Sequence, residues 1–157
     1  MKQKKDNPGV VIPPPLIYAA IFLLSILVQK YIPLNNAFMQ REVTHYIGYV
    51  IIGVSLLFTI PALLQFLRTK NTLITFKAAN SLQTTGIYSI TRNPMYMGLL
   101  VIYTGIALEV GNPWTLLFIP IVMLVITRYV IINEEKYLER AFNNTYLEYK
   151  TKVRRWI

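Results

Sequence analysis

Two groups of polar residues interrupt a largely apolar chain, and both contain residue types that could bind a charged ligand. The first group lies between Leu82 and Gly98, where Asn93 and Pro94 come just before a new apolar stretch. Because asparagine is a favoured helix N-cap and proline suits the first helical turn, we expect a helix to begin at Pro94. The unpaired backbone N–H groups of such a helix start favour a carboxylate or another anionic group.

The second polar group is the adjacent pair Glu134 and Glu135, which follows another long apolar stretch. Carboxylate oxygens are hydrogen-bond acceptors, so such a pair at a membrane boundary can hold a cation or the two hydroxyls of a ribose. Taken alone, the pair would be interpreted as the solvated first turn of a charged helix. Taken with the first group, it predicts a ligand-binding site.

Composition limits the other kinds of chemistry. The chain has 157 residues, enough for a single domain over 1–157, and it contains no cysteine. A disulfide framework, a thiolate nucleophile and a thiolate metal site are therefore excluded. The one histidine, His45, argues against a histidine-based metal site or a Ser–His–Asp triad, and it is interpreted as a solvated or hydrogen-bonded residue. No metal site is predicted.

The apolar residues are gathered in blocks that indicate an all-α polytopic membrane protein. Hydrophobic residues make up 54% of the chain and charged residues 15%, against roughly 45–50% and 25% in soluble domains. Because a bilayer requires roughly 20 helical residues, the blocks predict about four transmembrane helices. Their approximate ranges are 11–32, 46–67, 95–110 and 114–132.

The connections between these helices are also informative. The sequence Gly111-Asn112-Pro113 leaves room only for a tight hairpin between the third and fourth spans. A lysine-rich start before the first span resembles a signal peptide, but no small-residue cleavage pattern follows, so we expect an uncleaved span. After Ile132 the fourth helix is expected to continue as an amphipathic cytoplasmic helix, with a left-handed break at Asn143-Asn144.

Lysine and arginine are concentrated on one side of the predicted spans. That side carries Lys2, Lys4, Lys5, Arg68, Lys70, Lys77, Arg92, Lys136, Arg140, Lys150, Lys152, Arg154 and Arg155. The other side carries only Lys30 and Arg41, so the positive-inside rule predicts an integral membrane protein with both termini in the cytoplasm, in the inner membrane if the source is bacterial. Cytoplasmic loops and anionic headgroups explain the net charge of +9 better than a nucleic-acid partner does.

With these elements in place, the polar residues resemble a known superfamily, that of the isoprenylcysteine carboxyl methyltransferases and phospholipid methyltransferases. Its pattern is a Gly-Pro-Tyr segment, Arg-His-Pro-x-Tyr, a Glu-Glu pair and a Phe-Gly-x-x-Tyr-x-x-Tyr tail. The matching segments here are Gly86-Ile87-Tyr88, Arg92-Asn93-Pro94-Met95-Tyr96, Glu134-Glu135 and Phe142-Asn143-Asn144-Thr145-Tyr146-Leu147-Glu148-Tyr149. The resemblance covers about the last half of the chain, and Asn93, Ile87 and Asn143 depart from the family residues.

The resemblance implies a site for S-adenosylmethionine at the cytoplasmic membrane face, within residues 82–98 and 128–157, and a lipid-like or amphipathic acceptor that enters sideways from the bilayer. One wall would consist of Gln83, Gly86, Tyr88, Arg92, Asn93, Pro94 and Tyr96, and the other of Glu134 and Glu135. Methyl transfer from a sulfonium needs mainly alignment and exclusion of water, which suits a chain without cysteine.

The resemblance also implies two catalytic residues, Glu135 and an arginine that steers an acceptor carboxylate. In the isoprenylcysteine branch that arginine lies about one turn before the Glu pair, where this chain has Val130 or Ile131. Arg128, seven residues before Glu135, is the nearest candidate and is expected on nearly the same helix face. The alternative interpretation is that Arg128 extends to the cytoplasmic surface.

Two other functions are compatible with the sequence. Sterol reductases have a similar C-terminal pattern but use NADPH, and a non-enzymatic membrane scaffold could use the same residues only for packing. Tyr146 and Tyr149 are interpreted as packing residues, and Glu109 as a charge at the membrane boundary. The methyl acceptor stays open between a carboxylate, an amine, a thiol and a phospholipid headgroup, and so does the oligomeric state.

Overall fold

The computed structural model describes residues 7–69 and 79–157, and every regular element in them is a helix. The elements are α1 (Pro14–Tyr31), α2 (Glu42–Arg68), the 3₁₀ turn η1 (Gly86–Ser89), α3 (Pro94–Val110), α4 (Pro113–Leu117), α5 (Ile119–Val125), the π-helical turn η2 (Ile126–Ile131) and α6 (Ile132–Lys152). The predicted all-α fold is confirmed. Five lysines used for the orientation, Lys2, Lys4, Lys5, Lys70 and Lys77, lie outside the described residues.

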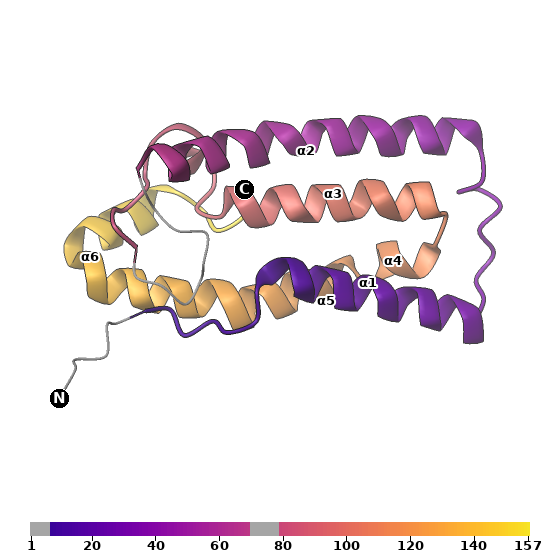
Figure 1. Cartoon of the computed structure of the whole chain (residues 1–157), viewed down its shortest axis with the longest axis horizontal. Coiled ribbons are helices and arrows are strands. Elements are labelled where there is room, and N and C mark those ends of the chain that lie inside the picture. Colours follow the sequence, from indigo (N-terminus) through magenta and orange to yellow (C-terminus); the bar gives the residue numbers. More distant parts are fainter. Residues whose placement is uncertain (1–6, 70–78) are drawn as a thin grey trace.

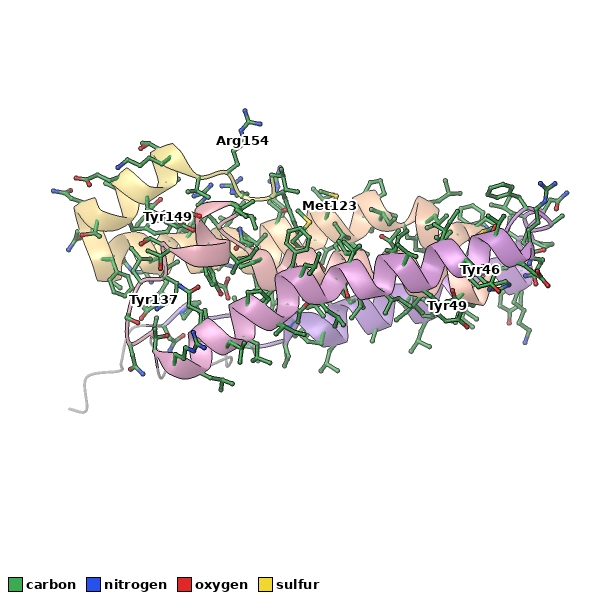
Figure 2. All side chains as sticks on the ribbon, turned by 90° about the horizontal axis from the view of Figure 1, so that it is seen from above. Tyr46, Tyr49, Met123, Tyr137, Tyr149 and Arg154 are labelled. Atoms are coloured by element: carbon green, nitrogen blue, oxygen red, sulfur yellow. The ribbon has the colours of Figure 1, made fainter. Side chains whose placement is uncertain are left out.

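The long helices form an elongated bundle (Figure 1). Helices α1, α2 and α3 run along its long axis, α4 and α5 lie beside α1, and α6 turns back at one end. This end also holds the start of α3 and the end of α2. In Figure 2, Tyr137 and Tyr149 lie at this end, whereas Tyr46 and Tyr49 lie on α2 at the opposite end. The bundle therefore brings both polar groups of the sequence to one end.

Helix α2 packs against α3 through small side chains. Its buried residues include Gly48, Ser55 and Ala62, which recur every seven residues and so lie along one face. A Cβ atom added to Gly105 of α3 would lie only 2.9 Å from the carbonyl oxygen of Gly48. Small residues allow this close backbone approach, which is how transmembrane helices commonly associate. The large side chains of α2 are left to face outward.

These outward side chains give the bundle an apolar surface. On α2, Tyr46, Tyr49 and Leu57 are each more than 60% exposed. Helices α1 and α2 are long and apolar enough to cross a membrane, and the 27 residues of α2 reach about 40 Å at 1.5 Å per residue. The shorter apolar helix α3 has 17 residues. Two candidate spans are thus seen in the described residues, within an apolar surface suited to lipid.

The predicted hairpin and the predicted break are both present. Gly111 ends α3 in the left-handed region (φ 65°, ψ 36°), and the Asn112 side chain accepts a hydrogen bond from the Trp114 backbone at the start of α4. Asn143 has φ 44° and interrupts α6, which then folds back toward the bundle. The predicted fourth span is not one regular helix, because it is divided into α4, α5 and η2.

Candidate functional site

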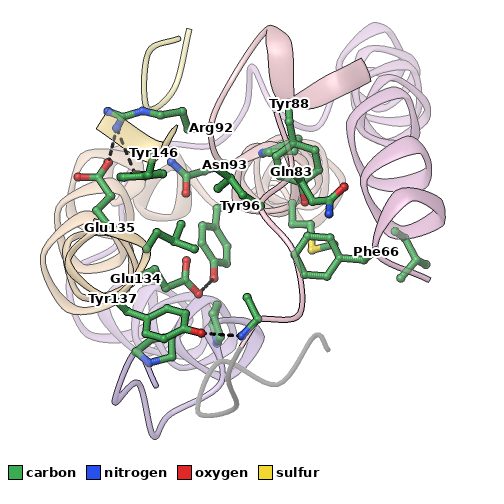
Figure 3. A pocket seen from close by; sticks show the side chains of 18 of the residues that line it. Phe66, Gln83, Tyr88, Arg92, Asn93, Tyr96, Glu134, Glu135, Tyr137 and Tyr146 are labelled. Carbon is green, nitrogen blue, oxygen red and sulfur yellow. Dashed lines mark hydrogen bonds and ion pairs between the residues drawn. The ribbon is translucent and has the colours of Figure 1, made fainter. Parts of the chain in front are cut away.

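A cavity of about 420 Å³ lies at the end of the bundle where α2 ends, α3 begins and α6 begins (Figure 3). Its walls come from the N-terminal segment and the start of α1, from α2, from the segment before α3, from the start of α3 and from α6. The lining residues are Pro8, Pro14, Pro15, Thr59, Leu63, Phe66, Ala79, Ser81, Leu82, Gln83, Tyr88, Arg92, Asn93, Pro94, Met95, Tyr96, Leu99, Glu134, Glu135, Tyr137, Leu138, Tyr146 and Tyr149. Most of them are apolar or aromatic, with a few polar groups, as in typical small-molecule sites.

One wall is the start of α3, which begins at Pro94 as predicted. Tyr96 lies in the first turn of this helix, and its hydroxyl donates a 2.6 Å hydrogen bond to Glu134 Oε1 on α6. Tyr88, from the turn before α3, stacks on Phe66 of α2 with a centroid separation of 5.9 Å. Aromatic faces thus line the cavity on the side opposite the glutamates.

Glu134 lines this cavity, and within residues 7–69 and 79–157 no basic side chain forms an ion pair with it. Burial raises the pKa of Glu134 to about 7, the Tyr96 hydrogen bond lowers it, and the neighbouring charge of Glu135 raises it again. Glu134 therefore changes charge near neutral pH, and a positively charged ligand in the cavity would favour its ionised form.

Glu135 has a different environment although it also lines the cavity. It is 5% exposed and accepts two hydrogen bonds from Arg155, at 2.9 Å from Nε and 2.7 Å from Nη2. Arg92 Nη1 lies 3.1 Å from Glu135 Oε1, the oxygen that also accepts from Arg155 Nε, and the same nitrogen donates to the Tyr146 hydroxyl at 3.4 Å. Two guanidinium groups therefore neutralise Glu135, and burial raises the pKa of Tyr146 to about 12 so that its phenol stays neutral.

The segment after α6 is joined to the segment before α3. The Thr91 hydroxyl and the Asn93 side-chain amide each donate a 3.0 Å hydrogen bond to the Arg155 carbonyl. The Arg92 backbone N–H donates to the Arg154 carbonyl at 2.9 Å. Asn93 occupies the cap position of α3 but makes no side-chain cap bond, so the expected capping by its side chain is wrong. Its amide donates to the Arg155 carbonyl instead.

Gln83 and Gly86 hold the turn that carries Tyr88. The Gln65 amide of α2 donates to Gln83 Oε1 at 3.0 Å. Gly86 begins η1 with φ 61°, a conformation that favours glycine, and does not line the cavity. The Tyr149 hydroxyl completes this support with a 2.6 Å hydrogen bond to the Tyr88 carbonyl. Of the expected cofactor-binding residues, all except Gly86 line the cavity.

Arg128 does not lie at the cavity. Its side chain is exposed, whereas Glu135 is buried, so the expectation that the two share a helix face is wrong. The reason is the π-helical turn Ile126–Ile131, in which hydrogen bonds join residues five apart. Such a turn contains more residues than an α-helical turn, so seven residues no longer return the chain to the same face.

Several residues of the site were not expected from the sequence. Phe66 of α2 and Tyr137, two residues after Glu135 on α6, line the cavity, and Arg155 contacts Glu135 from the segment after α6. Tyr137 accepts a 2.8 Å hydrogen bond from the Ala79 backbone. Within residues 7–69 and 79–157 no group of three His, Cys, Asp or Glu side chains could hold a metal ion.

Comparisons with known proteins agree with the motifs. Residues 43–145 match the phospholipid methyltransferase family. An uncharacterized protein of Haemophilus influenzae is 44% identical over 63 residues, which are 40% of this chain and 100% of that protein. The protein-S-isoprenylcysteine O-methyltransferase of Saccharomyces cerevisiae is 39% identical over 69 residues, 44% of this chain and 29% of the yeast enzyme. No solved structure matches. The resemblance is thereby confirmed, and the chain belongs to the phospholipid methyltransferase family of membrane methyltransferases.

Proposed function

We propose that this membrane methyltransferase takes its methyl group from S-adenosylmethionine and transfers it to an amphipathic acceptor in the cavity between α3 and α6. The observation that carries the proposal is the position of Glu134. Among the described residues this carboxylate has no basic partner, and it lies in a cavity lined by aromatic side chains. Carboxylates and aromatic faces both attract a sulfonium cation.

The charges around the cavity are complementary to a zwitterionic donor. Glu134, Tyr96 and Tyr88 would lie near its positive groups. Its carboxylate would lie at the start of α3, whose first backbone N–H groups have no helical partner, near Arg92. Within the described part of the chain, Arg92 Nε is buried and has no hydrogen-bond partner. A bound anionic group would satisfy this nitrogen.

The chemistry requires little covalent participation from the protein. The bound donor supplies an activated methyl group, and the chain aligns the acceptor with it and excludes water. For an acceptor that loses a proton, Glu134 is placed to receive it, because a pKa of about 7 suits proton transfer at neutral pH. The cavity thus supplies alignment, a negative charge and a proton acceptor.

The same charges discriminate among acceptors. Of the described residues that line the cavity, Arg92 is the only lysine or arginine, and the proposal already assigns it to Glu135 and to the donor's carboxylate. An isoprenylcysteine-like acceptor carboxylate would therefore be repelled by Glu134, with no second cation among these residues to offset the repulsion. An amine or a thiol would not meet this repulsion, so we place these two acceptors first.

The membrane orientation is part of the proposal. Apart from Arg128, which lies within the fourth predicted span, the described basic residues at the cavity end are Arg68, Arg92, Lys136, Arg140, Lys150, Lys152, Arg154 and Arg155. Those at the other end are Lys30 and Arg41, which supports a cytoplasmic cavity, four spans and cytoplasmic termini. Pro14 of α1 and Leu63 of α2 both line the cavity, so an acceptor could enter from the bilayer between these helices.

The test is calorimetric titration of the detergent-purified protein with S-adenosylhomocysteine, with NADPH titrated in parallel. We expect micromolar binding of the first compound only, because the described lining residues offer the several phosphates of NADPH one arginine, Arg92, which also pairs with Glu135. Binding of NADPH alone would assign the chain to reductase chemistry, and binding of neither would favour a scaffold. Labelled methyl groups from S-adenosylmethionine would then identify the acceptor, since methyl esters release methanol in base and methylamines do not.

A further inference from the structure

We infer that Arg155 is a positioning residue for the cavity, which fixes the turn of residues 91–93 and, through that turn, the start of α3. The effect on donor binding rests on the proposed function. The effect on the turn itself does not. Arg155 lies outside the two polar groups of the sequence and does not line the cavity, so it would act through other residues.

The side chain of Arg155 acts through Glu135. Its two nitrogens lie 2.9 and 2.7 Å from the two carboxylate oxygens, which is the paired geometry that makes arginine–carboxylate contacts strong and directional. Glu135 is 5% exposed and, from its Oε1, also contacts Arg92. A buried carboxylate that loses one of two cations is costly. Removing Arg155 would therefore disturb Glu135 and the Arg92 side chain with it.

The backbone of Arg155 acts directly on the turn. Its carbonyl accepts hydrogen bonds from the Thr91 hydroxyl and from the Asn93 amide, both at 3.0 Å. The Thr91 hydroxyl also lies 3.2 Å from the Asn93 backbone nitrogen. Asn93 immediately precedes Pro94, the first residue of α3. One carbonyl thus holds two of the three residues that lead into the helix start.

The flanking residues keep Arg155 in place. On one side, Val153 is 9% exposed and packs with Tyr146 and Tyr149 in a small apolar cluster. On the other side, Trp156 packs against the main apolar core. The segment after α6 is therefore anchored on both sides of Arg155. An anchored residue of this kind can transmit its position to the turn, whereas a free surface arginine could not.

The experiment compares Arg155→Gln, Arg155→Lys and the control Lys152→Gln, which removes a charge from an exposed side chain at the end of α6. Amide hydrogen exchange of the ligand-free protein is measured for the peptide that contains Arg92, because its N–H donates to the Arg154 carbonyl. Faster exchange in Arg155→Gln, a smaller change in Arg155→Lys and none in Lys152→Gln are expected. Unchanged exchange in Arg155→Gln, with the protein folded, would overturn the inference.

The second measurement is titration of the same folded variants with S-adenosylhomocysteine. We expect the Kd of Arg155→Gln to rise about tenfold, the effect of losing one charged hydrogen bond, and that of Lys152→Gln to stay unchanged. An unchanged Kd in Arg155→Gln would refute the link to donor binding. If the wild-type protein binds no S-adenosylhomocysteine, the proposed function fails, and the exchange result still decides whether Arg155 positions the turn.

Discussion

The Tyr96 hydroxyl donates a 2.6 Å hydrogen bond to Glu134, and this contact joins the start of α3 to the start of α6 across the cavity. The two glutamates of the pair thereby serve different purposes. Glu135 is held by two arginines, whereas Glu134 is held by a neutral phenol. A neutral partner orients a carboxylate without cancelling its charge. Glu134 therefore stays available for a cationic ligand.

The substitution Tyr96→Phe should weaken donor binding and should also lower the stability of the ligand-free protein, because the hydrogen bond to Glu134 is already present there. The missing hydroxyl no longer orients Glu134, and loss of a hydrogen bond to a charged group corresponds to a free-energy change of about 1.5–3 kcal/mol. We expect a rise of at least about tenfold in the Kd for S-adenosylmethionine.

A matched control is Tyr103→Phe on the same helix. Within the described part of the chain the Tyr103 hydroxyl is buried and has no hydrogen-bond partner, so its removal should leave binding unchanged and stability unchanged or raised. Titration calorimetry and thermal melting measure both effects. Equal Kd values for wild type and Tyr96→Phe would show that the contact does not serve the ligand.

Donor binding should depend on pH through Glu134. Because the pKa of Glu134 is about 7, its negative charge increases as the pH rises from 6 to 8. S-adenosylmethionine carries a sulfonium charge that S-adenosylhomocysteine lacks, so the ratio of their affinities should rise across this range. In Glu134→Gln the ratio should be flat. A rising ratio in the variant would assign the dependence to another group.

The same pKa predicts the effect of pH on stability. Burial raises the pKa of Glu134 from 4.5 to about 7, so between these values the folded protein binds more protons than the unfolded chain. The stabilising contribution of the protonated group is complete below pH 4.5 and is lost as the pH rises through 7. The melting temperature of the ligand-free wild-type protein should therefore fall between pH 4 and pH 8. In Glu134→Gln the melting temperature should fall by less over the same range.

Proline, glycine and asparagine in the sequence correctly predicted where helices begin, end or break. Pro94 begins α3, Gly111 ends it, and Asn143 interrupts α6 at a positive φ, each as expected from the conformational preferences of the residue. Most of the residues named from the family motifs line the cavity, and Gly86 does not. The contact between Arg155 and Glu135 was not predicted, since the two residues are twenty positions apart and only the fold-back of α6 brings them together.

The π-helical turn was the second feature missed. Helical periodicity assumes 3.6 residues per turn, and an apolar sequence such as Ile126–Ile131 carries no signal for an extra residue in the turn. The placement of Arg128 depended on that periodicity. The π-helical turn shifts the helical register, so the observed position of Arg128 differs from the position expected from the sequence.

The close approach of α2 and α3 should be sensitive to a single methyl group. In Gly105→Ala the new Cβ would lie 2.9 Å from the Gly48 carbonyl oxygen, which is backbone and cannot move aside cheaply. Overpacking of this kind costs about 1–3 kcal/mol. Gly53→Ala on α2 is the control, because its Cβ would meet nothing within 4 Å and alanine favours the helix. Thermal melting in detergent should show a lower midpoint for Gly105→Ala only, and equal midpoints would refute the packing argument.

Arg128 provides a test that separates sequence position from spatial position. Its spacing from Glu135 suggests a catalytic arginine, but its side chain is exposed and does not line the cavity. We expect Arg128→Gln to retain kcat and the acceptor KM within about twofold, since surface substitutions seldom perturb distant sites. Glu134→Gln, only six residues further along the chain, should lower kcat/KM by at least about tenfold, because it removes the charge that faces the ligand. A large rise in acceptor KM for Arg128→Gln, with kcat preserved, would instead place Arg128 on the route by which the acceptor reaches the cavity from the bilayer.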